Sequence, residues 1–323
     1  MIPLPGEVRA MWERLGEGAS VPLPSEVELK RQCDGLVTCS EAVALAERTL
    51  TAAEIESPPR FEAQLLVAQA LCSDRSAVVA RTAAGPDAHQ KDELFRLLSN
   101  RVKRVPLAYL RGNQEFYGIR FAVNSATLIP RPETELLVDF AREVLGARPL
   151  GDNPIVIDVG CGSGCILIAV LAHCPLARAV AVDISSDALQ VARSNAVRLG
   201  ISDRIRFVQA NLLDGVQDGP QLIISNPPYI ESGQIDKLQP EVAAYEPRLA
   251  LDGGADGLLH IREIVKSAAR LLASGGWLAV ECGQGQAGRV FDLFTEAGLT
   301  ALRVVSDLAG IQRIVCGMRA FVS

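Results

Sequence analysis

Residues 155–164 read Ile-Val-Ile-Asp-Val-Gly-Cys-Gly-Ser-Gly, and the apolar run Ile166–Leu171 follows one residue later. The first five residues predict a buried β-strand, the glycines a tight turn, and the apolar run a helix packed on the strand. Glycines let the backbone turn sharply and lie against a ligand with no Cβ in between. Open α/β sheets bind their ligands where such a strand turns into a helix. This corner therefore predicts an α/β fold and the place of its ligand.

The remainder of the chain, from Arg131 onward, continues the same alternation of strands and helices. A helix is expected from Arg131-Pro132-Glu133-Thr134-Glu135 to about Val144. Strands are expected at Ile155–Val159, Val180–Val182, Ile205–Val208, Leu222–Ser225, Trp277–Glu281, Ala301–Val305 and Ile314–Gly317. This order predicts a mostly parallel sheet with helices on both faces.

The segment before this α/β region predicts a smaller, helical domain. Apolar residues recur at helical spacing from Ser40 to about Arg104, with Ser40 as a candidate N-cap. Pro58-Pro59 is expected to begin the second helix, and Gly85-Pro86 to separate it from the third. Alternating residues around Gly112 and Gly118 predict a β-hairpin. The expected division is a loosely attached extension over 1–35, in which Glu7–Leu15 favours a short helix, a helical domain over 36–105, a hairpin linker over 106–128 and the α/β domain over 129–323.

Composition limits the classes of protein to be considered. With 323 residues, 49% of them hydrophobic, the chain can bury a large core in two domains. A net charge of −6 disfavours a surface built mainly for nucleic-acid phosphates. The eight cysteines show no two-residue spacing, so we expect free thiols and no metal site. Met1–Ala10 is not a basic and apolar leader, and no run of about eighteen apolar residues occurs, so we expect a cytoplasmic protein without membrane contact.

The glycine loop discriminates among cofactors. Its spacing is G-x-G-x-G, whereas a dinucleotide site would read G-x-G-x-x-G and a P-loop would add a lysine. Asp158 would repel a pyrophosphate but can help to hold the cationic amino-acid end of S-adenosylmethionine. Asp183 ends the second strand, where a carboxylate can accept both ribose hydroxyls. The candidate cofactor-binding residues are Asp158, Gly160, Cys161, Gly162, Ser163, Gly164, Asp183, Asn211, Leu212 and Asn226.

Purely structural roles compete with these assignments. The glycines could only permit close packing of helix on strand, and Asp183 could only cap the next helix. Asn211 is placed to contact the adenine amino group, with Leu212 beside the ring, but it could equally stabilise its own turn. Arg131 and the acids after it form either a charged latch beside the cofactor or a solvated helix start.

The segment Ser225-Asn226-Pro227-Pro228-Tyr229-Ile230 follows the apolar run Leu222–Ile224 and predicts a stiff turn at the end of a buried strand. Two prolines remove two N–H donors, which leaves the Asn226 and Pro227 carbonyls as acceptors. The Asn226 side-chain oxygen and the Pro227 carbonyl can each accept one hydrogen of a planar amino group, while the Tyr229 ring covers it. We therefore assign catalysis to Asn226, Pro227 and Tyr229, and substrate binding to these residues with Pro228. Alone, the motif could also be a tight loop without function.

Together these motifs resemble a known family. Asp158–Gly164, Asp183 and Asn226–Tyr229, in this order, are similar to class I S-adenosylmethionine-dependent methyltransferases that modify an amide or amino nitrogen. Further segments resemble the HemK-type peptide chain release factor glutamine methyltransferases over about residues 40–320. These segments are Glu115–Gly118, Leu128–Glu135, Glu246–Leu251, Gly254–Leu258 and Asp307–Gly310 with Arg313.

The resemblance implies a Rossmann-like, mostly parallel seven-stranded sheet with helices on both faces, preceded by a small all-α domain and a hairpin linker. It also implies that the helical domain recognises release factors, and that the catalytic domain methylates the glutamine of their Gly-Gly-Gln motif with S-adenosylmethionine. Asn211 departs from the family, which commonly has Asp there. The alternatives are a glutamine methyltransferase of a large-subunit ribosomal protein, an adenine amino-methyltransferase acting on nucleic acid, and a non-catalytic binding protein.

Overall fold

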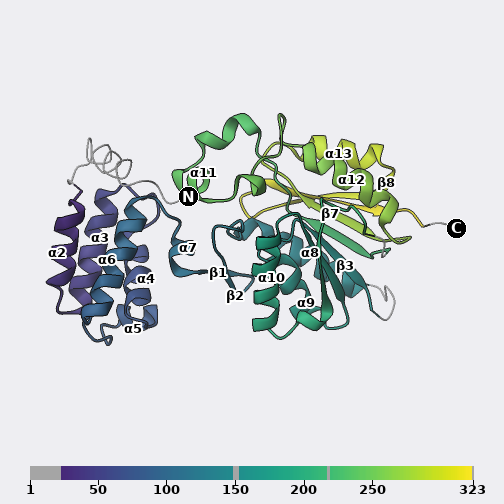
Figure 1. Cartoon of the computed structure of the whole chain (residues 1–323). Helices are drawn as coiled ribbons and strands as arrows, with labels where there is room; N and C mark the ends of the chain where they lie inside the picture. Colours follow the sequence, from purple (N-terminus) through teal and green to yellow (C-terminus); the bar gives the residue numbers. More distant parts are fainter. Residues whose placement is uncertain (1–22, 148–152, 217–218, 322–323) are drawn as a thin grey trace. The chain divides into compact units, whose positions relative to one another are not determined.

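The computed structural model describes residues 23–147, 153–216 and 219–321 (Figure 1). Its contacts divide the chain into two compact units, Met1–Arg111 and Gly112–Ser323. In the described ranges, no helix has both the length and the apolar character needed to cross a membrane.

The first unit is a bundle of helices around one apolar core. Its helices are α2 (Glu26–Asp34), α3 (Cys39–Ala52), α4 (Pro59–Ala70), α5 (Arg75–Val79), α6 (Ala88–Val102) and α7 (Leu107–Arg111). The second helix begins at Pro58-Pro59 as predicted. The expected N-cap at Ser40 is wrong. Thr38 caps α3 instead, because its hydroxyl and the Glu41 carboxylate close a capping box at each other's backbone amides.

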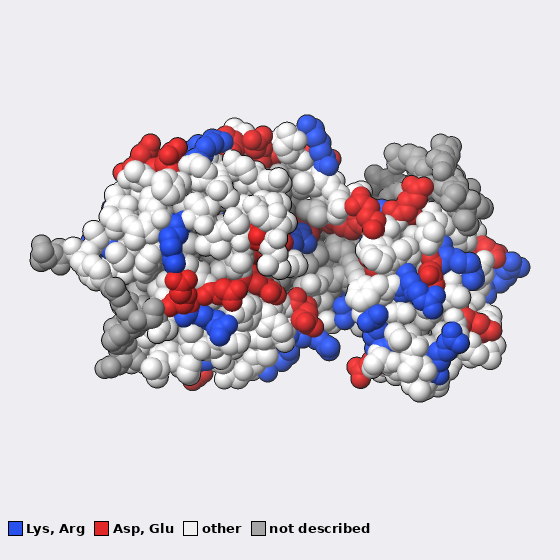
Figure 2. All heavy atoms as spheres, turned by 180° about the vertical axis from the view of Figure 1, so that it is seen from behind, with Lys and Arg blue, Asp and Glu red and all other residues white. Residues whose placement is uncertain are grey.

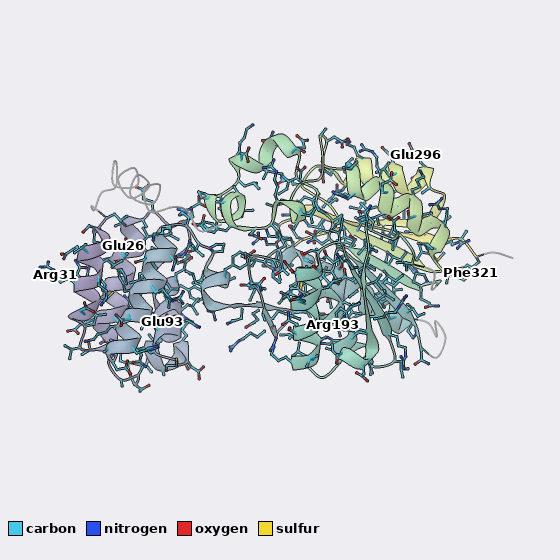
Figure 3. The ribbon with its side chains drawn as sticks, in the orientation of Figure 1. Glu26, Arg31, Glu93, Arg193, Glu296 and Phe321 are labelled. Carbon is cyan, nitrogen blue, oxygen red and sulfur yellow. The ribbon has the colours of Figure 1, made fainter. Side chains whose placement is uncertain are left out.

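Helix α2 lies in the segment that the sequence predicts as a loosely attached extension. Ser25 caps α2 by accepting the Glu28 amide, and Leu29 and Cys33 are fully buried in the core of the bundle. Arg31 lies on the outer side of α2 (Figure 3), whereas Glu26 pairs with Lys103 at the end of α6, with 3.4 Å between Oε1 and Nζ. Residues 25–34 are therefore integral to this unit, which corrects the prediction for them. The short helix expected at Glu7–Leu15 lies outside the described residues.

The second unit opens with the predicted hairpin, β1 (Asn113–Phe116) and β2 (Ile119–Ala122), which pair antiparallel. Tyr117 and Gly118 turn the hairpin with φ of 52° and 71°, values that favour glycine at the second position. Phe116 and Phe121 are buried in the core of this unit. The hairpin therefore packs as part of the α/β unit.

A seven-stranded sheet in the order β5-β4-β3-β6-β7-β9-β8 forms the centre of this unit. The two pairs that involve β9, with β7 and with β8, are antiparallel, and the other neighbouring strands are parallel. The predicted fold class is confirmed. The strands are β3 (Ile155–Val159), β4 (Arg178–Asp183), β5 (Ile205–Gln209), β6 (Leu222–Ser225), β7 (Trp277–Glu281), β8 (Leu299–Ser306) and β9 (Gln312–Arg319).

Helices cover both faces of the sheet. Residues of α8 (Glu135–Ala147), α9 (Cys165–His173) and α10 (Ser186–Arg198) share one apolar core with the sheet. Residues of α12 (Leu259–Leu271) and α13 (Ala287–Glu296) share the other. The connections over the ends of the strands contain α11 (Pro240–Tyr245) and four 3₁₀ turns, η1 (Pro132–Thr134), η2 (Ser202–Arg204), η3 (Ser232–Lys237) and η4 (Arg248–Ala250). This arrangement leaves the carboxyl ends of β3, β4 and β6 to carry the predicted motifs.

Candidate active site

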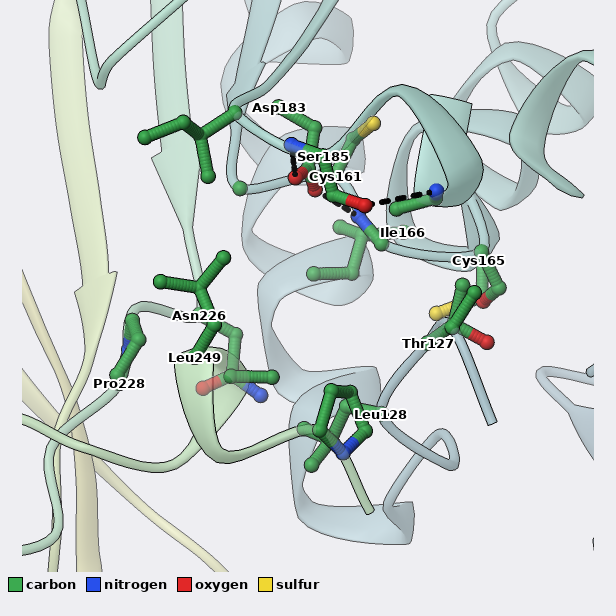
Figure 4. Close-up of a pocket in the computed structure, with 18 of the residues that line it drawn as sticks. Thr127, Leu128, Cys161, Cys165, Ile166, Asp183, Ser185, Asn226, Pro228 and Leu249 are labelled. Atoms are coloured by element: carbon green, nitrogen blue, oxygen red, sulfur yellow. Dashed lines mark hydrogen bonds between the residues drawn. The ribbon is translucent and has the colours of Figure 1, made fainter. Parts of the chain in front are cut away.

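A cavity of about 200 Å³ lies within the second unit, where the loops after β3, β4, β5 and β6 meet (Figure 4). One water needs only about 10–15 Å³ on this measure, so the space suits an organic ligand. Most of the predicted residues line it: Gly160, Cys161, Gly162, Ser163, Asp183, Asn211, Leu212, Asn226 and Pro228. Asp158, Gly164, Pro227 and Tyr229 are not in its wall.

Glycine occupies the three positions of the loop for different physical reasons. Gly160 and Gly162 have φ of 73° and 53°, and a Cβ added to either would meet no protein atom within 4 Å. Their backbone therefore faces open space at the cavity. At Gly164 an added Cβ would lie 3.1 Å from the side chains of Ala192 and Ile168. Gly164 thus permits the close packing of α9 against α10, whereas the first two glycines leave room for a ligand.

Asp183 links the glycine loop to the next turn. Its two carboxyl oxygens accept the Gly162 and Ser185 amides, each at 2.9 Å (Figure 4). The actual N-cap of α10 is Ser185, whose hydroxyl accepts the Ala188 amide. Burial raises the pKa of Asp183, and the backbone amides oppose this rise. Because each carboxyl oxygen retains a lone pair, Asp183 can still accept ribose hydroxyls in the cavity.

Asp158 lies at the end of β3, off the cavity wall. Its side chain is fully buried, and neither carboxyl oxygen has a hydrogen-bond partner among the described residues. Burial, and next the charge of Asp183, raises the pKa of Asp158 to about 7. An unpaired buried carboxyl next to a loop that opens to the cavity suits a cationic group of a ligand. Asp158, Asp183 and the open backbone of Gly160 and Gly162 are together chemically suited to bind S-adenosylmethionine.

The Asn-Pro-Pro-Tyr loop places its polar groups as acceptors. In the described residues, no backbone amide donates to the Asn226 or Pro227 carbonyl. The Asn226 side chain reaches the cavity, and its Nδ2 donates to Thr134 Oγ1 at 3.1 Å. This bond leaves the side-chain oxygen of Asn226 as an acceptor. Pro227 is buried behind the wall that Pro228 lines.

Tyr229 is held from two sides. Its hydroxyl lies 3.3 Å from Glu281 Oε1, a partner that the sequence reasoning missed. Its backbone oxygen accepts Gln286 Nε2 at 3.0 Å. Gly253 and Gly257 approach its backbone so closely that a Cβ on either would lie within 3.0 Å of a Tyr229 atom. The glycine-rich segment after η4 therefore packs directly against the backbone of the Asn-Pro-Pro-Tyr loop.

Replacing Gly257 with alanine should displace this loop. The new Cβ would lie 2.4 Å from the Tyr229 carbonyl oxygen, at a φ of +73°. We expect kcat to fall at least about tenfold, with a loss of stability of about 1–3 kcal/mol. Gly288→Ala is the control, because a Cβ there meets nothing within 4 Å. Steady-state kinetics and thermal denaturation check this. An unchanged kcat for Gly257→Ala would show that close packing at Gly257 does not position the Asn-Pro-Pro-Tyr loop.

An ion pair joins two segments of the cavity wall. Arg131 donates to the buried carboxylate of Glu246, which also accepts the Ile129 amide at 3.0 Å. Residues on both sides of this pair line the cavity: Leu128, Pro130 and Arg131 on one side, and Pro247, Leu249 and Ala250 on the other. Of the two alternatives left open for Arg131, the ion pair favours a latch beside the cavity, with Glu246 as the partner of Arg131.

Substituting Glu246→Gln should loosen this wall. The amide keeps the size of the side chain but removes the charge that pairs with Arg131. We expect the Kd of S-adenosylhomocysteine to rise about tenfold by calorimetry, since a charge-assisted bond contributes about 1.5–3 kcal/mol. Glu143→Gln is the control, because its pair with Arg303 is exposed and both residues lie off the cavity wall. Equal affinities for the two variants would show that the pair does not shape the cavity.

Comparison with known proteins places this site in a family. The model for "Methyltransferase small domain" matches residues 135–244, and that for "PrmC N-terminal domain" matches residues 41–112. A release factor glutamine methyltransferase of Bradyrhizobium diazoefficiens is 40% identical over 280 residues, 85% of this chain and 94% of that protein. The chain belongs to the release factor glutamine methyltransferase family. A relative of the same name from Caulobacter vibrioides is 40% identical over 88% of this chain and 97% of its own length.

Solved structures agree with this assignment at the level of the fold. The catalytic domain of hMettl16, in complex with the MAT2A 3′UTR hairpin 6, has a TM-score of 0.53 and 15% identity. It covers 70% of this chain and 82% of that chain. The α/β unit of this family member therefore has the fold of a methyltransferase catalytic domain.

Proposed function

We propose that this enzyme transfers a methyl group from S-adenosylmethionine to the side-chain amide nitrogen of the glutamine in the Gly-Gly-Gln motif of peptide chain release factors. The observation that carries this proposal is the acceptor oxygen of Asn226 at the wall of the cavity, with its Nδ2 engaged by Thr134. The names of the relatives support the substrate.

The residues of the chain divide the work of the reaction. Asp158, Asp183 and the backbone of the glycine loop would hold S-adenosylmethionine, with Asn211 and Leu212 at its adenine. When bound, this cofactor supplies a methyl group made electrophilic by its sulfonium. Asn226 and the Pro227 carbonyl would accept the two amide hydrogens of the substrate. These bonds orient the nitrogen and oppose delocalisation of its lone pair into the carbonyl, which favours attack at nitrogen.

The charge pattern on the face shown in Figure 2 favours a protein over a nucleic acid as substrate. On the face shown in Figure 2, acidic and basic side chains are interspersed, and a run of acidic side chains crosses the larger unit. Phosphate binding would favour a continuous basic band instead. We propose that the helical unit, which includes the predicted recognition domain over 36–105, contacts the release factor.

A single labelling experiment tests this function. The protein is incubated with labelled S-adenosylmethionine and, in parallel, with release factor, a release factor whose Gly-Gly-Gln glutamine is alanine, ribosomal protein and DNA. We expect label on the glutamine of the intact release factor alone, located by mass spectrometry. Label on the ribosomal protein or on DNA, with none on release factor, would replace the proposed substrate.

A further inference from the structure

The carboxyl of Glu281 lies beside the Asn-Pro-Pro-Tyr loop and has no role in the proposed methyl transfer. Ser225 pairs with Val280 in register, so Glu281 and Asn226 follow as neighbours at the ends of β6 and β7. Glu281 is fully buried. Its Oε1 is bonded to the Tyr229 hydroxyl, whereas Oε2 has no bonded partner in the described part of the chain. A buried carboxyl whose second oxygen is unpaired destabilises the fold, so its position beside Asn226 suggests a functional reason.

Thr134 lies between this carboxyl and Asn226. It comes from η1, its side chain is buried, and its Oγ1 accepts Asn226 Nδ2 at 3.1 Å. The same hydroxyl interacts with the Glu281 carboxyl, and this interaction opposes the rise of the pKa of Glu281. A hydroxyl has one hydrogen and can rotate it to the best acceptor. Since a carboxylate can only accept, and Oε2 of Glu281 has no bonded partner in the described residues, we infer that the hydrogen of Thr134 points toward Glu281 while its oxygen accepts from Asn226 at 3.1 Å.

We propose that Glu281 and Thr134 are positioning residues that fix the side-chain amide of Asn226 with its oxygen toward the substrate. The inference rests on the proposed function, because only an amino group needs that oxygen. An asparagine amide is nearly symmetric in shape, so packing alone does not choose between its two orientations. The bond from Asn226 Nδ2 to Thr134 Oγ1 makes that choice, and the interaction of Thr134 with Glu281 keeps the hydroxyl hydrogen away from Asn226. Tyr229 anchors the other end of the same loop to the same carboxyl.

The hydrogen-bond relay from Asn226 through Thr134 to Glu281 requires Glu281 to be ionised. Burial raises its pKa to about 7, Glu133 adds to the rise, and Arg313 opposes it. Arg313 itself is paired with Asp307 at 2.9 Å. If Glu281 were protonated it could donate to Thr134, whose hydrogen would then turn to Asn226 and favour the reversed amide. Because ionisation is complete only above this raised pKa, kcat should rise with pH through about 7.

Threonine variants test the relay directly. Thr134→Val removes the hydroxyl at nearly constant volume, and we expect kcat to fall about 10- to 100-fold. Thr134→Ser restores the hydroxyl and should recover most of the activity. Thr49→Val is the control, because Thr49 is equally buried and its hydroxyl donates to the Leu45 carbonyl of its own helix. Calorimetry with S-adenosylhomocysteine should show that the Kd of Thr134→Val changes less than threefold.

Glutamate variants and spectroscopy complete the test. In Glu281→Gln we expect a similarly lowered kcat that no longer rises through pH 7, and the Thr134→Val, Glu281→Gln double variant should be no slower than the slower single variant. The Asn226 side-chain amide resonance, assigned by its loss in Asn226→Asp, should shift in Thr134→Val and not in Thr134→Ser.

Different results would overturn the proposed function and the positioning role of Thr134 and Glu281. Absence of release-factor methylation by the wild-type enzyme would overturn the proposed function. An active wild-type enzyme with an unchanged kcat and unchanged Asn226 amide resonance in Thr134→Val would overturn the relay alone. Folding of each variant is checked by thermal denaturation, and Thr134→Ser keeps the test decisive if Thr134→Val is unstable.

Discussion

Replacing Asn226 with alanine should lower kcat for glutamine methylation by about 100- to 1,000-fold, the usual effect of losing one preorganised polar contact to the reacting group. The alanine keeps the loop, because both prolines remain, but removes the only side-chain acceptor that the loop offers to the substrate nitrogen. We expect the Kd of S-adenosylhomocysteine to change less than about threefold. Single-turnover kinetics and calorimetry on the same preparation separate the two quantities.

A catalytic role and an architectural role of Asn226 differ in their effect on cofactor affinity. Asn226 is part of the cavity wall, so a purely architectural role would change kcat and the Kd of S-adenosylhomocysteine together. A wild-type kcat in Asn226→Ala would remove the residue from catalysis. A loss of cofactor affinity as large as the loss of kcat would instead assign it to the cofactor site.

The sheet could be predicted from the sequence because its signals are local. Each strand from Ile155–Val159 to Ile314–Gly317 is a short apolar run between turn residues, and all were found within two residues of the predicted bounds. Helix α2 was missed because its charged face and the nearby prolines outweigh the two residues, Leu29 and Cys33, that it buries. Propensity is a weak guide where tertiary packing decides.

The partners in the candidate site could not be predicted because they are distant in sequence. Thr134 lies 92 residues from Asn226, Glu281 lies 52 residues from Tyr229, and Glu246 lies 117 residues from Ile129. One signal was present: Glu281, like Asp158 and Asp183, is an acid that comes at the end of an apolar strand. An acid in that position of a parallel sheet faces the ligand edge, which is a reason to examine it.

Asp183→Ala should raise the Kd of S-adenosylmethionine at least about 100-fold, which corresponds to about 2.7 kcal/mol. Two losses add up in this variant. The ribose hydroxyls lose their acceptor, and the Gly162 and Ser185 amides lose the carboxylate that orders the glycine loop. Asp183→Asn keeps one acceptor oxygen, so its Kd should be intermediate. Asp187→Ala is the control, since Asp187 is an exposed acid one turn later on α10.

The pH dependence of binding separates the two roles of Asp183. Burial raises its pKa above that of an ordinary aspartate, so its charge is lost at a higher pH than usual as the solution is acidified. Wild-type affinity should fall with decreasing pH through that raised pKa. Asp183→Asn should lose this part of the pH dependence and keep the part that comes from Asp158, whose pKa is raised to about 7. If Asp183→Asn binds as tightly as the wild type at neutral pH, the carboxylate charge is dispensable. One acceptor oxygen would then be enough at this position, and the assignment of both ribose hydroxyls to the Asp183 carboxylate would be wrong.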